Sequence, residues 1–380
     1  MAVFFTFAIF INVECYAESS DGSQALTTAI DEIINGLDLT DVEDAFSDID
    51  FFGAFDARNE IRNYLGGQTD FDLNDVFDIL INAIFGSIKE YLPELLAVMA
   101  IAVFGCILDA LKPTSPDASV SQIGFFAVNA LTIGLVSSIF FSVFSVAKIA
   151  IESMTGQIQA VFPVILTLIT AAGANGTATS LQPSVAYVCS IESVIAEKIL
   201  FPITVTIFLF GAVNSLTLNS KLSKISDFFK SCFKWITGAS SVIFTFFISA
   251  KSVAASTFDG FSIKALKYVV GNGVPIVSQI VNGGFDIVFA SCVLVKNSLG
   301  LLALVALVAT VFSPLIKIVV CGLFIRFAAA AIQPVSDERI VRFMTCSADA
   351  LNYLSAILIS IAVVYFITVF VTVCSLGVSV

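Results

Sequence analysis

The chain has 380 residues, of which 58% are hydrophobic and 13% are charged, and its net charge is −12. A soluble domain usually carries about 25% charged residues, so this composition excludes an ordinary soluble globular protein. The negative charge argues against nucleic acid as a partner, and the absence of histidine removes the commonest general base and the commonest zinc ligand.

Residues 1–17 resemble a secretory signal peptide. An apolar run of about ten residues is followed by small side chains at Cys15 and Ala17, which predicts cleavage after Ala17. No Lys or Arg precedes the apolar run, so an uncleaved membrane anchor is the alternative.

Residues 18–90 predict a small acidic domain in the extracytoplasmic aqueous phase. They contain 17 acidic and three basic residues. Apolar residues at helical spacing predict helices within Leu26–Leu37 and Asp75–Lys89, and Gly66-Gly67 marks a break between them. The acidic surface is interpreted either as a solvated face or as a docking surface for a basic partner.

Residues 91–380 predict a polytopic transmembrane domain in the lipid bilayer, so the fold class is all-α. About seven to nine membrane helices are expected, because only helices and closed barrels satisfy their backbone in lipid and barrel alternation is absent. The segments long enough to cross are Leu92–Leu111, Gln122–Ala147, Gln157–Ala174, Phe201–Leu218, Gly238–Ala255, Pro275–Val295, Leu299–Phe324 and Leu351–Leu376.

Basic residues predict which side is cytoplasmic. One cluster, Lys221 to Lys234, also has an apolar face and predicts an interfacial amphipathic helix. A second cluster contains Arg326, Arg339 and Arg342. Both are placed in the cytoplasm and the N-terminus outside, while the topology between residues 251 and 296 stays open.

Charged and polar residues inside the apolar region are the candidate functional residues, because such groups normally face a bundle interior, water or another charge. They are Glu152, Asp286, Lys296, Asn297 and Lys317. Lys296 is hypothesised to pair with Glu152 or Asp286, and for Lys317 snorkelling to the interface is an equal alternative.

Four prolines are candidate helix breaks, namely Pro163, Pro183, Pro314 and Pro334. Each removes a helical hydrogen bond, which predicts either a packed kink or a broken helix beside a conduit. Their spacing also suggests a weak internal repeat with an offset of 151 residues, a plan common among transporters.

No motif predicts catalysis. The chain has no GxxxxGK[ST] nucleotide-binding loop, no histidine for a Ser-His-Asp triad and no CxxC pair among its eight cysteines. We therefore expect no enzymatic activity, no cofactor and no metal site.

An ordered set of segments resembles one known family. The set comprises Phe162–Leu168, Ala171–Gly173, Cys292–Leu301, Ser313–Ile318, Ala328–Pro334 and Asp337–Ile340. Together with the signal-like segment and the acidic front piece, it is similar to stage III sporulation protein AE of endospore-forming Firmicutes.

The resemblance implies a non-enzymatic subunit of the complex between mother cell and forespore, which is proposed to act as a channel or feeding tube. It implies a multi-pass protein of the mother-cell membrane around the forespore, needed for late forespore gene expression. The expected partners are the ATPase, ring-forming and polytopic membrane subunits of that complex. A stand-alone secondary transporter or permease for a small molecule is the alternative.

Overall fold

The computed structural model describes residues 20–47, 56–65, 118–216, 223–273, 278–334 and 337–374, with scattered residues between 85 and 104. Within these ranges the chain is helical apart from short turns, and the described part contains no β-strand. The predicted all-helical fold class is therefore confirmed. The signal-like segment and most of the predicted helix at Asp75–Lys89 lie outside the described residues.

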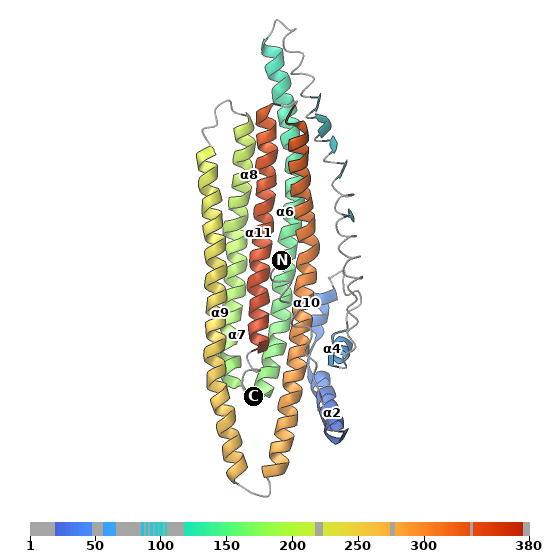
Figure 1. The fold of residues 1–380 in the computed structure, drawn as a ribbon, viewed down its shortest axis with the longest axis vertical. Helices are drawn as coiled ribbons and strands as arrows, with labels where there is room; N and C mark the ends of the chain where they lie inside the picture. The colour runs from blue at the N-terminus through green and yellow to red at the C-terminus, as the bar shows by residue number, and fades with distance from the viewer. Residues whose placement is uncertain are drawn as a thin grey trace.

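Long helices lie side by side in one elongated bundle (Figure 1). They are α6 (Ala118–Ala171), α7 (Asn175–Ile195), α8 (Phe201–Leu216), α9 (Ser223–Gly273), α10 (Ser278–Ile332) and α11 (Glu338–Cys374). A π-helical turn, η2 (Ala196–Leu200), joins α7 to α8, so the two form one helical pass. Successive passes run in opposite directions (Figure 1). Helix α11 packs against α6, α8, α9 and α10.

Five helical passes are long and apolar enough to cross a membrane, among the residues that the structure describes. The 54 residues of α6 extend about 80 Å, whereas a bilayer has a hydrocarbon core of about 30 Å. The predicted count of seven to nine membrane helices is not confirmed. Most of the segment Leu92–Leu111 lies outside the described residues.

Two pairs of predicted spans are merged into single helices. Gln122–Ala147 and most of Gln157–Ala174 fall on α6, and most of Pro275–Val295 and all of Leu299–Phe324 fall on α10. The polar residues between the members of each pair lower hydropathy without ending the helix. In α6 the intervening Lys148 and Glu152 form an ion pair one helical turn apart, with 3.4 Å between Nζ and Oε1.

Large apolar side chains cover the outside of the bundle. Trp235 is 77% exposed, Phe246 73% and Phe327 66%. Contiguous exposed apolar surface is rare on soluble monomers, so these faces fit contact with lipid. The described helices therefore support the prediction of a multi-pass membrane protein.

Aromatic side chains pack the interior near the α8–α9 end. The rings of Phe140 and Phe208 stack with centroids 4.2 Å apart, joining α6 to α8. Phe233 of α9 packs against Tyr353 of α11 at 4.6 Å. The basic cluster from Lys221 therefore does not form a separate interfacial helix. Its described part is the beginning of the 51-residue α9, in which Phe233 is buried against Tyr353 while Phe228 and Trp235 stay exposed.

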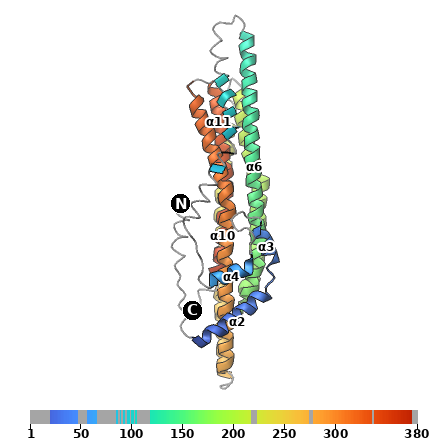
Figure 2. The same ribbon diagram turned by 90° about the vertical axis from the view of Figure 1, so that its right-hand side faces the viewer.

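Three short helices lie against the side of the bundle, close to α6 and α10 (Figure 2). They are α2 (Ser20–Gly36), α3 (Thr40–Ser47) and α4 (Ala57–Leu65). The first contains most of the predicted helix Leu26–Leu37, which is thereby confirmed. Arg62 of α4 binds Asp31 of α2 at 2.9 Å, and Ile34, Val42 and Ile61 are fully buried.

Aspartates cap two of these short helices. Asp56 accepts backbone hydrogen bonds from Arg58 at 3.0 Å and Asn59 at 3.1 Å, at the beginning of α4. Asp38 accepts from both the hydroxyl and the backbone N–H of Thr40. These bonds to the charged form lower the pKa of Asp38, so the cap is present at neutral pH and is lost only when acid protonates the carboxylate.

Candidate functional site

Three hydroxyl groups meet in the interior of the bundle, each from a different helix. Thr155 of α6 lies 3.1 Å from Ser193 of α7 and 3.2 Å from the hydroxyl of Tyr365 of α11, measured between oxygens. Ser193 lies 3.1 Å from the same Tyr365 hydroxyl. The Tyr365 side chain is fully buried, and its hydroxyl also donates to the carbonyl of Cys189 at 3.3 Å. We call Thr155, Ser193 and Tyr365 the hydroxyl cluster.

A buried carboxyl group lies beside the hydroxyl cluster. Glu192 directly precedes Ser193, is 2% exposed and lies within the candidate span Ala178–Leu216. Ser240 of α9 interacts with this carboxyl, while its Oε2 atom has no hydrogen-bond partner. A buried polar atom without a partner is costly and uncommon in native proteins.

The backbone is irregular immediately after the carboxyl group. The backbone N–H of Phe201 donates to the carbonyl of Ala196, five residues earlier, which gives the π-helical turn η2. Pro202 follows, and its ring nitrogen cannot donate a helical hydrogen bond. Single π-helical turns inside long helices occur frequently at functional sites.

Further polar contacts link the bundle helices. Gln157 of α6 donates to the hydroxyl of Thr310 of α10 at 2.6 Å, and its Oε1 atom is buried without a partner. Ser241 of α9 and Ser360 of α11 lie 2.5 Å apart between hydroxyl oxygens. Together with the hydroxyl cluster, these contacts make the middle of the bundle unusually polar for a membrane interior.

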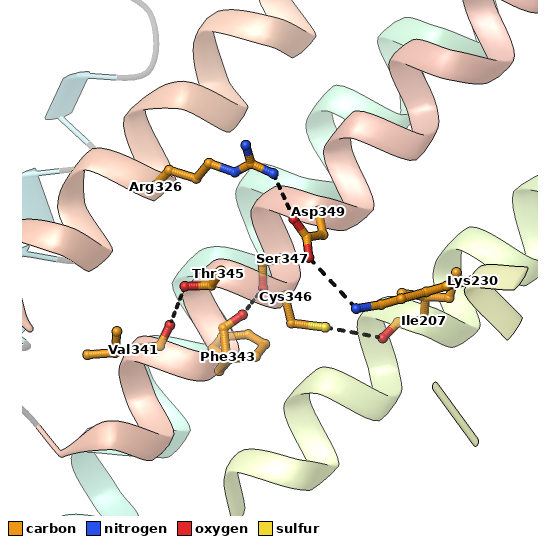
Figure 3. Close-up of polar contacts among 9 residues, drawn as sticks. All are labelled: Ile207, Lys230, Arg326, Val341, Phe343, Thr345, Cys346, Ser347 and Asp349. Carbon is orange, nitrogen blue, oxygen red and sulfur yellow. Dashed lines mark hydrogen bonds and ion pairs between the residues drawn. The ribbon is translucent and has the colours of Figure 1, made fainter. Parts of the chain in front are cut away.

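A separate charged site lies on three helices towards the end that carries the α10–α11 turn (Figure 3). Asp349 of α11 binds Arg326 of α10 at 2.7 Å and Lys230 of α9 at 3.7 Å. The thiol of Cys346 is directed at the backbone carbonyl of Ile207 on α8, with 3.8 Å between sulfur and oxygen. This site joins the two predicted basic clusters at one end of the bundle.

Of the two hypothesised partners of Lys296, Glu152 is paired elsewhere, and the side chain of Asp286 lies outside the described residues. Glu152 is exposed and pairs with Lys148, so it is not the partner of Lys296. Lys296 is fully buried and donates to the backbone carbonyl of Val373, in the last turn of α11. A positive charge there is favoured by the helix dipole.

The remaining predicted residues, Asn297, Lys317 and Asp286, all belong to α10. Asn297 is exposed and Lys317 is half-buried on α10. Asp286 lies on α10, but its side chain lies outside the described residues.

The helices continue through three of the four candidate helix-breaking prolines. Pro163 lies inside α6, Pro183 inside α7 and Pro314 inside α10, whereas Pro334 lies in the turn after α10. One missing hydrogen bond is tolerated because the neighbouring turns and packed helices hold the backbone. Pro183 and Pro334 also occupy different elements, so the suggested repeat does not place them equivalently.

Sequence reasoning missed Glu192 and the hydroxyl cluster. Glu192 itself carried a usable signal, since it is the single charged residue between Gly176 and Ala196. The hydroxyl cluster had none, because its three members lie 38 and 210 residues apart.

The described residues contain no group of three or more Cys, Asp or Glu side chains that could hold a metal ion. A surface hollow of about 460 Å³ lies between α6 and the η2–α8 segment, and Lys148, Glu197 and Lys198 line part of it. The groups of the buried polar region can donate and accept hydrogen bonds.

Comparisons with known proteins agree on one family. Residues 55–376 match the family described as Stage III sporulation protein AE. The chain is 21% identical over 314 residues to "Stage III sporulation protein AE" of Bacillus subtilis (strain 168), covering 82% of this chain and 78% of that protein. No solved structure matches the chain.

Proposed function

Because the chain belongs to the stage III sporulation protein AE family, we propose that it is a non-enzymatic subunit of the channel complex between mother cell and forespore. Family membership and the apolar helices make it a sporulation-related membrane protein. The finer proposal places it in the mother-cell membrane around the forespore, where it is needed for late forespore gene expression. Its partners would be the ATPase, ring-forming and polytopic membrane subunits of the complex.

The length of the helices is the observation that supports a role in an assembly. The 55 residues of α10 extend about 80 Å, more than twice the thickness of a hydrocarbon core. When the helices cross a membrane roughly along its normal, part of the bundle must therefore project into water on at least one side. Such a projection offers a rigid surface to other subunits, whereas a bundle matched to the bilayer would not.

The experiment is purification of the tagged full-length protein from sporulating cells in a mild detergent. We expect the ATPase and ring-forming subunits to be retained in fixed proportion. Two variants are compared. The triple variant combines Glu32→Gln, Asp41→Asn and Asp44→Asn and removes exposed acidic charge from α2 and α3. The control variant, Glu338→Gln, removes one exposed charge at the other end of the bundle. Selective loss of a subunit with the triple variant would assign the acidic helices to docking.

The alternative function is a stand-alone secondary transporter, and the buried Glu192 is the observation that favours it. The purified protein reconstituted in vesicles distinguishes the two functions. A complex subunit should show no solute flux alone. Flux by the isolated chain, together with failure to retain any complex subunit, would overturn the proposal.

A further inference from the structure

Glu192 has no charged partner in a membrane interior. Its side chain is 98% removed from solvent by α6, α7, α9 and α11, and it forms none of the ion pairs found in the described part of the chain. The nearest basic residue along its own helical pass is Lys198, which lies within the π-helical turn and is exposed. Glu192 is thus a carboxyl group in an environment that offers hydrogen bonds and no counter-charge.

This environment favours the neutral form of the carboxyl group. Burying an ionised carboxylate without a partner costs several kcal/mol, and buried acids avoid that cost by taking up a proton. The unpartnered Oε2 atom is consistent with this, because a protonated carboxyl needs fewer donors than a carboxylate does. The hydroxyl group of Ser240 can donate a hydrogen bond to the ionised form.

The groups that face Glu192 come from every helix packed around it. Ser240 of α9 interacts with the carboxyl, and α11 contributes Tyr365, which senses the charge of Glu192. Thr155 of α6 is held against Tyr365. Cys189 lies one turn away on the same face of α7. Hydroxyl and thiol groups can donate to a carboxylate or accept from a carboxylic acid, so this set accommodates both protonation states.

The π-helical turn gives the site a feature that a packing role alone would not require. It begins four residues after Glu192 and interrupts the regular hydrogen-bond ladder between the carboxyl group and α8. Such turns change the direction of side chains at the point where they occur. A structural carboxyl could be replaced by an apolar residue at lower energetic cost, so its presence beside this turn indicates a chemical use.

We propose that Glu192 is a reversible proton-binding site inside the membrane-spanning bundle, with the hydroxyl cluster and Ser240 as its polar surroundings. The proposal concerns the chemistry of the bundle interior and does not depend on the place of the protein in the sporulation complex. The ligand is a proton, because the described residues lack the cluster of ligands that a metal ion needs.

The test is labelling with dicyclohexylcarbodiimide, an apolar reagent that reacts with protonated carboxyl groups in membranes. Membranes containing the full-length protein are treated at several values from about pH 5 to about pH 9, and the adduct on the Glu192 peptide is quantified by mass spectrometry. We expect labelling at low pH that falls about tenfold or more across this range, because the reactive protonated fraction falls about tenfold per pH unit above the midpoint.

Two controls make the result specific. Glu192→Gln should abolish labelling of this peptide, and Glu192→Asp should retain it. Glu152→Gln should leave it unchanged, because Glu152 is exposed and paired with Lys148. No adduct on Glu192 at any pH would overturn the proposal by showing a permanently ionised group. An adduct of constant yield across the whole range would also overturn it, by showing a proton that does not exchange.

Discussion

Asp349 of α11 binds a basic residue on each of α9 and α10, and so holds the three helices together through charge. We predict that Asp349→Asn lowers the stability of the bundle by about 1 kcal/mol, because Arg326 and Lys230 then repel each other without an anion between them. The magnitude is small because all three side chains keep between 24% and 46% of their exposure. The unfolding midpoint of the purified protein in detergent measures the effect.

Glu338→Gln is the matched control for this change. Its ion pair with Arg342 lies within one helix, and the Glu338 side chain is 83% exposed. It should therefore shift the midpoint by much less than Asp349→Asn. Equal shifts for the two variants would show that the three-helix contact adds nothing beyond an ordinary surface pair.

Lys296 stabilises the end of α11. We predict that Lys296→Met lowers stability by about 2 kcal/mol, because the carbonyl of Val373 loses a charged donor in a buried position. Protease sensitivity of the C-terminal turns and the unfolding midpoint in detergent measure this change. Lys224→Met is the control, since Lys224 is exposed at the beginning of α9. If Lys296→Met and Lys224→Met change protease sensitivity and the unfolding midpoint equally, Lys296 does not cap the helix.

Sequence reasoning identified Lys296 as an interior charge but not the partner that the structure gives it. An acid is the natural partner to expect for a lysine in lipid, whereas the acceptor found here is the backbone carbonyl of Val373. Glu192 was missed, although it is the single charged residue between Gly176 and Ala196. A charge can thus be recognised from sequence, but its partner depends on how distant helices align.

Close approach of α10 and α11 requires a glycine. A Cβ atom at Gly300 would lie 2.1 Å from Cγ2 of Val373, so we predict that Gly300→Ala destabilises the bundle by about 1–3 kcal/mol. Gly156→Ala on α6 meets nothing within 4 Å and should be neutral or slightly stabilising. The unfolding midpoints of the two purified variants in detergent are compared.

A compensating change tests the geometry directly. Val373→Ala in the Gly300→Ala background removes the atom that is struck and should recover part of the lost stability. If the double variant is as unstable as the sum of its parts, the two helices do not touch at this position.

At the scale of elements, hydropathy identified the membrane helices but not their ends. The gap between two predicted spans in α6 is a salt-bridged helical turn, and the gap in α10 contains the buried Lys296. Neither gap contains a proline or a turn, so the helix continues. At Pro163, Pro183 and Pro314 the helix continues, because the neighbouring turns and packed helices hold the backbone where an isolated helix would break.

At the scale of the whole molecule, composition alone was enough for an all-helical membrane protein. The family could also be recognised, because its ordered segments survive in the sequence. Two features could not be predicted. They are the order of the helices around α11 and the contact between Thr155, Ser193 and Tyr365. These depend on contacts between residues that are far apart in the chain, about which local periodicity carries no information.

The bundle has two chemically different ends. Arg326, Arg339 and Lys230 lie towards the end with the α10–α11 turn, whereas the acidic α2–α4 group lies towards the opposite end (Figure 1). Cytoplasmic segments are enriched in Lys and Arg, so we predict that the α10–α11 turn faces the cytoplasm and α2–α4 face the outside.

Cysteine labelling tests this orientation in a background where the native cysteines are replaced. In intact protoplasts of vegetative cells that express the protein, where its extracytoplasmic face is open to the medium, Asn59→Cys on α4 should react with a membrane-impermeant maleimide, whereas Glu338→Cys should react only after permeabilisation. Both positions lie in charged surroundings at the surface, so a difference in labelling reports the side of the membrane and not burial. Labelling of Glu338→Cys alone in intact protoplasts would invert the topology. Labelling of both would place the two ends on one side, which would require the bundle to lie outside the bilayer and would remove the physical basis for a buried proton site in a membrane.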